Sequence, residues 1–73
     1  MIQPMTIQSY TLDRETGVCS VEIAAHVVEY PLAELEGWIC FYDRQRERFP
    51  KSRDKYDVVI NLLESALAER DLN

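Results

Sequence analysis

The apolar residues of this chain change their spacing at Tyr30-Pro31. Before that point they alternate with polar residues, as in a strand that buries one face. After it they recur every three or four residues, as on a helix that packs along one side. A proline also pushes the residue before it into extended geometry and suits the first turn of a helix. The sequence therefore predicts strands up to Tyr30 and helices beyond it.

The N-terminal part predicts a β-hairpin. Residues 5–12 are uncharged and rich in Thr, Ile and Tyr, which is typical of a strand. The polar run 13–17 ends in Gly17, which can adopt the left-handed conformation that closes a short hairpin loop. A second strand is expected over residues 18–24. Its odd-numbered residues should face the core: Cys19, Val21 and Ile23, followed by Ala25.

The apolar positions change parity after Ala25, because Val28 and Tyr30 are apolar and Glu29 is polar. A strand cannot exchange its two faces without a break, so a bulge or a tight turn is expected near residues 24–26. No Gly, Asn or Asp marks a turn there. The sequence therefore leaves open whether residues 27–30 end a bent second strand or form a short third strand.

Two amphipathic helices are expected over residues 31–48 and 54–69. Pro50 prevents the first helix from continuing, and the short polar connection makes the two helices antiparallel neighbours. A chain of 73 residues is too short for two cores and predicts a single domain over 1–73. The expected fold is α+β, ββ(β)αα, an antiparallel hairpin with both helices packed on one face. The apolar stripes are Leu32, Leu35, Ile39 and Tyr42, then Tyr56, Val59, Ile60, Leu63 and Leu67.

Composition restricts the classes of partner. The net charge is −5, which opposes nucleic acid as the favoured partner, because phosphate binding needs cations. No apolar run approaches the roughly 20 residues of a membrane helix, and no export signal opens the chain, so no membrane partner and a cytoplasmic location are expected. Cys19 and Cys40 lack the spacing of metal ligands and are expected to be free, buried thiols.

The residues needed for enzyme chemistry are sparse. The chain has one His and two Cys, and it contains no Gly-rich phosphate loop. Cys19 and His26 would lie far apart and on opposite faces of a straight strand. His26, Glu29 and Glu34 have no recognised metal-ligand spacing. The sequence therefore predicts a protein that is not an enzyme, with no catalytic residue, no cofactor and no metal site.

A basic stretch and a few off-stripe apolar residues suggest binding surfaces. Residues 43–55 hold six of the eight basic side chains, and Phe41 lies off the core stripe on the side of the helix that carries Arg44 and Arg48. Arginine beside aromatic rings can hold single-stranded nucleic acid. The competing explanation is that these arginines offset the helix dipole and pair with neighbouring acids, while Tyr42, Phe49 and Tyr56 pack in the core.

Val58 and Leu62 lie one turn apart beside the core stripe of the second helix. Either the sheet covers a wide arc of that helix, or the two residues form a surface for self-association or for a partner. The predicted function is a small protein-binding or regulatory module that acts through helix faces, as a homodimer or on a larger partner. The alternatives are a nucleic-acid-associated module and a non-catalytic or site-completing subunit of a larger enzyme. The candidate partner-binding residues are Phe41, Arg44, Arg48, Lys51, Arg53, Val58 and Leu62.

Overall fold

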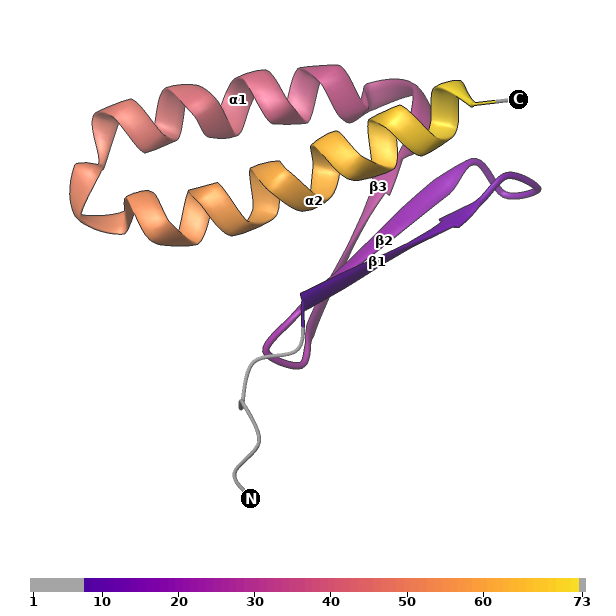
Figure 1. Cartoon of the computed structure of the whole chain (residues 1–73), viewed down its shortest axis with the longest axis horizontal. Helices are drawn as coiled ribbons and strands as arrows, with labels where there is room; N and C mark the ends of the chain where they lie inside the picture. Colours follow the sequence, from indigo (N-terminus) through magenta and orange to yellow (C-terminus); the bar gives the residue numbers. More distant parts are fainter. Residues whose placement is uncertain (1–7, 73) are drawn as a thin grey trace.

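The structure is a computed structural model that describes residues 8–72. It contains a three-stranded antiparallel sheet in the order β1-β2-β3, followed by two antiparallel helices that lie on one face of the sheet (Figure 1). The predicted ββ(β)αα architecture is confirmed, and the third strand is present. The elements are β1 Gln8–Asp13, β2 Val18–Ile23, β3 His26–Pro31, a 3₁₀ turn Leu32–Glu34, α1 Leu35–Arg48, a 3₁₀ turn Pro50–Ser52 and α2 Arg53–Asp71.

The element boundaries differ from the expected ones by a few residues. Residues 5–7 of the expected first strand lie outside the described residues. The first helix begins with a 3₁₀ turn, and its α-helical part starts at Leu35. Gly17 has a φ of +72° and donates its N–H to the carbonyl oxygen of Asp13 at 2.9 Å. The Asp13 carboxylate also accepts hydrogen bonds from the N–H groups of Glu15 and Thr16. The predicted turn between β1 and β2 is therefore confirmed.

The turn between β2 and β3 consists of Ala24 and Ala25 alone, because Ile23 pairs with His26. Both alanines have positive φ, at +52° and +71°. Two successive residues at positive φ give a hairpin turn whose twist matches that of the flanking strands. The expectation that the second strand runs to residue 24, with Ala25 facing the core, is wrong. The chain reverses after Ile23, and both alanines are exposed.

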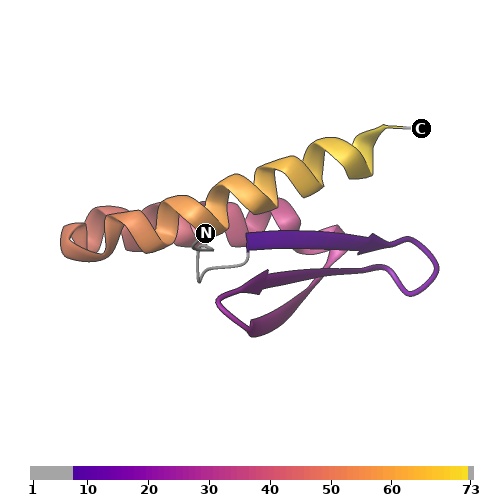
Figure 2. The ribbon, with the colours of Figure 1, turned by 60° about the horizontal axis from the view of Figure 1, so that its bottom comes forward.

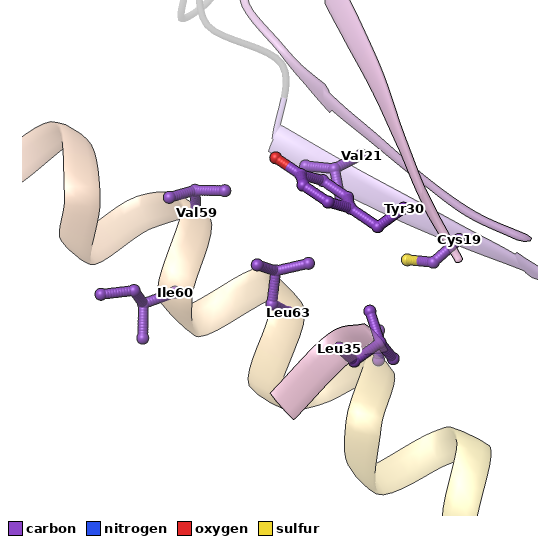
Figure 3. Packing of buried hydrophobic residues seen from close by; sticks show 8 residues of the cluster. Cys19, Val21, Tyr30, Leu35, Val59, Ile60 and Leu63 are labelled. Carbon is purple, nitrogen blue, oxygen red and sulfur yellow. The ribbon is translucent and has the colours of Figure 1, made fainter. Parts of the chain in front are cut away.

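The core lies between the sheet and α2, and it is completed by the start of α1. The strand register places the core-facing residues of the three strands in rows, for example Leu12 beside Cys19 beside Tyr30. α2 lies against β1 and β2, while α1 follows directly from β3 (Figure 2). The buried core consists of Cys19, Val21, Tyr30, Leu35, Val59, Ile60, Leu63 and Ala66 (Figure 3).

Two arginines fasten the C-terminal end of α2 to the rest of the fold. The Arg14 guanidinium donates hydrogen bonds to three carbonyl oxygens at the end of α2, at 2.6 to 3.3 Å. The Arg70 guanidinium donates to the carbonyl oxygen of Leu32 at 2.8 Å and to both carboxylate oxygens of Glu36 at 2.7 and 3.1 Å. Cations at a helix C-terminus are favourable because of its partial negative charge. Polar contacts therefore attach the C-terminal end of α2 to the β1–β2 turn and to the beginning of the first helix.

Two sequence expectations about burial are wrong. Phe49 is 48% exposed, because α1 ends at Arg48 and the helical stripe does not extend to the next residue. Cys40 is exposed, whereas Cys19 is fully buried, and both are free thiols.

Neither helix in the described part of the chain is long and apolar enough to cross a membrane.

Candidate functional site

Five aromatic side chains form a continuous cluster on the side of the molecule where β3 meets α1. The Trp38 ring centroid lies 5.3 Å from that of Tyr30 and 5.6 Å from that of Phe41, and both contacts are edge-to-face. Tyr42 contacts Phe41 at 5.4 Å and Tyr56 of α2 at 6.0 Å. Edge-to-face pairs at these distances are favourable beyond the area they bury. We call this set of five residues the aromatic face.

Local sequence explains how the aromatic face is held. Phe41 and Tyr42 follow Trp38 by three and four residues on α1, so each of them is a neighbour of Trp38 on the helix surface. The hydroxyl groups of Tyr30 and Tyr42 are hydrogen-bonded at 2.9 Å. Burial, followed by this hydrogen bond, raises the pKa of Tyr30 above its ordinary value, so its hydroxyl stays protonated. The indole N–H of Trp38 donates to a carboxylate oxygen of Glu34 at 3.2 Å. Hydrogen bonds thus help to hold the Tyr30, Trp38 and Tyr42 rings in place.

The outer part of the aromatic face is open to solvent. Phe41 is 45% exposed. It borders a depression of about 530 Å³ whose lining is mostly apolar. A Cβ added at Gly37 would meet nothing within 4 Å, so packing does not require a glycine at this position. The lining residues are Ala33, Glu34, Glu36, Gly37, Trp38 and Phe41.

The sheet and the helices diverge toward the connection between α1 and α2 (Figure 1). Residues of β2, β3, α1 and α2 line a groove between them. Val28 is 48% exposed although it pairs with the buried Val21, because the helices do not cover the sheet at this point. We call the groove the wedge groove. Its inner part, of about 290 Å³, is lined by Val21, Ile23, His26, Val28, Tyr30, Tyr42, Lys55, Tyr56 and Val59. Its outer part, of about 580 Å³, shares Ile23, His26 and Lys55 and adds Gln8, Ala24, Asp54 and Val58.

The strand β3 forms one edge of the sheet, and within residues 8–72 its outer side pairs with no strand. The two-residue turn makes Ile23 and His26 a hydrogen-bonded pair, and such pairs alternate along an antiparallel ladder. Val28 and Tyr30 therefore direct their backbone groups toward β2. Val27 and Glu29 direct their N–H and C=O groups away from the sheet. The side chain of Val27 is 59% exposed.

Of the candidate residues from the basic stretch, Lys51 lies in the connection between the helices, Arg48 and Arg53 lie at the adjoining helix ends, and Arg44 lies one turn earlier on α1. Arg44, Arg48, Lys51 and Arg53 are exposed and form no ion pair within the described residues. Arg46 differs, because its guanidinium bridges Asp43 on α1 and Asp57 on α2, the latter at 2.6 Å. These two hydrogen bonds raise the pKa of Arg46, and the bond that it donates to Asp57 has the larger effect. Among the six basic side chains of residues 43–55, Arg46 is therefore the one that forms ion pairs with nearby acids within the described residues.

The remaining three candidates lie in different environments. Phe41 is the one candidate that belongs to the aromatic face. Leu62 is partly buried and packs against the core, so the sheet side of the molecule covers a wide arc of α2. Val58 is partly buried and lines the outer wedge groove. The seven predicted residues therefore do not form one site.

Sequence reasoning named neither Trp38 of the aromatic face nor Val28 of the wedge groove as a candidate site residue. Trp38 lies on the flank of the helical stripe, and Val28 lies on the core side of β3. The apolar pattern includes Val28 among the apolar positions before Pro31, and it leaves open whether Trp38 closes the core or lies at an interface. Their partial exposure depends on where the helices diverge from the sheet. The spacing of apolar residues within one helix or strand does not reveal that position. The exposed Lys55 was counted with the basic stretch, but it lines the wedge groove.

The side chains considered for catalysis or metal binding are not brought together. His26 pairs with Ile23, which is four residues along β2 from Cys19. Burial raises the pKa of the Cys19 thiol, which keeps it protonated. Within residues 8–72 no three His, Cys, Asp or Glu side chains are grouped so that they could hold a metal ion. Comparisons with protein-family models, with curated proteins and with solved structures find no match.

Proposed function

We propose that the protein is a small protein-binding module that contacts its partner through the aromatic face on α1. The observation that carries the proposal is the open depression beside Trp38 and Phe41, where the Phe41 ring is 45% exposed and packs against the partly buried Trp38. Single exposed apolar residues are common, but contiguous aromatic surface is a mark of interaction sites. Tryptophan and tyrosine are also enriched among the residues that dominate binding energy.

The surroundings of the aromatic face support a specific interface. The Glu34 carboxylate accepts a hydrogen bond from the indole N–H of Trp38, and the hydroxyl groups of Tyr30 and Tyr42 are bonded to each other. A partner would therefore meet side chains that lose little conformational freedom on binding. Glu34 and Glu36 border the depression and provide a polar rim.

Site-specific photo-crosslinking tests this function. A benzoylphenylalanine placed at position 41 should form an adduct with a partner protein in the native cell, whereas one placed at the exposed position 61 of α2 should not. With the captured partner purified, Phe41→Ala should weaken binding by about 30-fold, the loss expected for a central aromatic residue. Asn61→Ala should bind as the wild type does. Equal binding by the two variants would contradict the proposal.

A second candidate function rests on a different observation. Besides Arg46, the cations of the basic stretch form no ion pair within the described residues, and the exposed Phe49 ring lies 5.9 Å from the Arg48 guanidinium. This surface suits a single-stranded nucleic acid. Fluorescence anisotropy with a labelled oligothymidine and a mixed-sequence RNA at low salt tests it. Binding should disappear when Arg44, Arg48 and Arg53 are all changed to Glu, and undetectable binding by the wild type removes this candidate.

A further inference from the structure

We propose that the free edge of β3 receives an extended segment of a partner protein as a fourth strand, with an acidic side chain of that segment facing Lys55. This inference rests on the proposed protein-binding function and specifies the kind of partner. The edge and the aromatic face are adjacent, because Tyr30 of β3 contacts Trp38 of α1. One partner can therefore engage both surfaces.

The backbone of β3 determines the conformation of the segment. Val27 and Glu29 present two N–H and two C=O groups on the outer side of the strand. An antiparallel strand placed there forms four backbone hydrogen bonds, which is how proteins bind peptides by strand addition. Edge strands are often protected by proline or charge. On β3, Pro31 marks only the end of the strand and Glu29 is the one acidic side chain, while Val27 and Val28 remain exposed at 59% and 48%.

The wedge groove determines the side chains of the segment. A fourth strand continues the pleat of the sheet, so every second residue points to the helix side. On that side it meets Val28, Tyr42 and Tyr56, which line the inner wedge groove. The bound segment should therefore carry apolar side chains at alternate positions. The groove has room for them, because its inner part has a volume of about 290 Å³.

The charges around β3 determine the sign of the charge on the segment. Lys55 lines both parts of the wedge groove, is exposed and forms no ion pair within the described part of the chain. His26 lies beside it, and Asp54 borders the outer part alone. The opposite face of the sheet carries Glu22 and Glu29. An acidic residue is therefore favoured on the groove side of the segment and disfavoured on the other side.

A second copy of this chain fits the same edge less well. Pairing of β3 with β3 would join two chains of net charge −5. It would also place both Glu29 carboxylates on one face of the joined sheet, where like charges oppose the pairing. The edge therefore favours a different protein whose extended segment is apolar and acidic.

Selection from a peptide library tests the inference without a known partner. The full chain is used to select from a phage-displayed library of random twelve-residue peptides. In the selected peptides, apolar residues should alternate with polar ones. One of the positions on the apolar side, which faces the groove, should hold an Asp or Glu. When the Lys55→Glu variant is used as the target, the selected peptides should carry Lys or Arg in place of this Asp or Glu. Recovery of no binder, or of binders without alternation, would overturn the proposal.

Two variants at one position isolate the backbone contact. Glu29→Pro removes an outward N–H that the β2–β3 ladder does not use, whereas Glu29→Gln keeps the N–H and removes the charge. A selected peptide should bind Glu29→Gln at least as well as the wild type and should bind Glu29→Pro about tenfold more weakly. Amide exchange on the wild type gives a second measurement that needs no variant. The N–H groups of Val27 and Glu29 should exchange quickly in the free protein and slowly with peptide bound, while that of Val28 is slow in both.

The results separate this inference from the proposed function. If Phe41→Ala weakens binding of the captured partner and Glu29→Pro does not, the strand-addition inference is wrong and the proposed function stands. If neither variant weakens binding of that partner, both proposals are wrong. Sedimentation of the wild type at micromolar concentration tests whether a second copy of the chain occupies the β3 edge. A dimer that Glu29→Pro dissociates would show that the edge pairs with a second copy, which also overturns the inference.

Discussion

The turn between β2 and β3 places two alanines in a backbone conformation that alanine disfavours. Ala24 and Ala25 have φ values of +52° and +71°. For a residue with a Cβ this left-handed conformation costs roughly 1–2 kcal/mol, whereas glycine adopts it freely and asparagine tolerates it. Asn-Gly is the pair of residues that such a two-residue hairpin turn prefers. We therefore expect Ala24→Asn with Ala25→Gly to stabilise the protein.

The magnitude follows from two opposing terms. Ala25→Gly relieves the backbone strain, but glycine loses about 0.5–1 kcal/mol more conformational free energy on folding than alanine does. The net gain for this single change is therefore about 0.5–1 kcal/mol, and Asn at position 24 adds a similar amount. A gain of about 1–2 kcal/mol is large for a domain whose core supplies about 3–5 kcal/mol. It should raise the Tm by roughly 4–8 °C per kcal/mol.

Urea unfolding followed by circular dichroism measures the free energy of unfolding of each variant. The control is Ala68→Gly, at an exposed position within α2, where glycine should destabilise the protein by about 0.5–1 kcal/mol. The same substitution is thus expected to have opposite signs at positions 25 and 68. If Ala25→Gly lowers the stability as Ala68→Gly does, Ala25 is not in the left-handed conformation and the reasoning is refuted.

Two further predictions concern the start of α1. Hydrogen bonds from Arg70 lower the pKa of the exposed Glu36 carboxylate from 4.5 to about 2, so this pair stabilises the protein above pH 4.5 and the contribution is lost as the pH falls toward 2. Urea unfolding should show a small stability difference between wild type and Glu36→Gln near neutral pH that disappears near pH 2, and a difference independent of pH would contradict this assignment. Gly37→Ala should raise the free energy of unfolding by about 0.5–1 kcal/mol, because glycine loses more conformational freedom in a helix than alanine does and the added methyl group has room. The same change should weaken partner binding at the depression, and unchanged affinity would place the partner elsewhere.

The two helices could be predicted from the sequence because their signals are local. Pro31 and Pro50 mark the boundaries, and the apolar stripes identify the buried side of each helix. Leu35 and Leu63, both on these stripes, are fully buried. The α+β architecture follows from the same change of period that separates the strands from the helices.

The third strand could not be decided from the sequence, because its turn lacks the residues that normally specify one. Ala24 and Ala25 carry no turn signal, so the sequence showed the change of parity but not the reversal of the chain. The exposure of Val28 and the open position of Trp38 depend on the angle between the helices and the sheet. Phe41 was recognised because its exposure follows from its position on the helix alone.

Trp38 is the single tryptophan of the chain, and it stands in the middle of the aromatic face. Tyrosines 30 and 42 lie within 6 Å of its ring and can transfer excitation energy to it. Its emission therefore reports the polarity of the proposed contact surface without any label. A ligand that excludes water from this surface should shift the spectrum to shorter wavelength, which gives a titration signal from the unmodified protein.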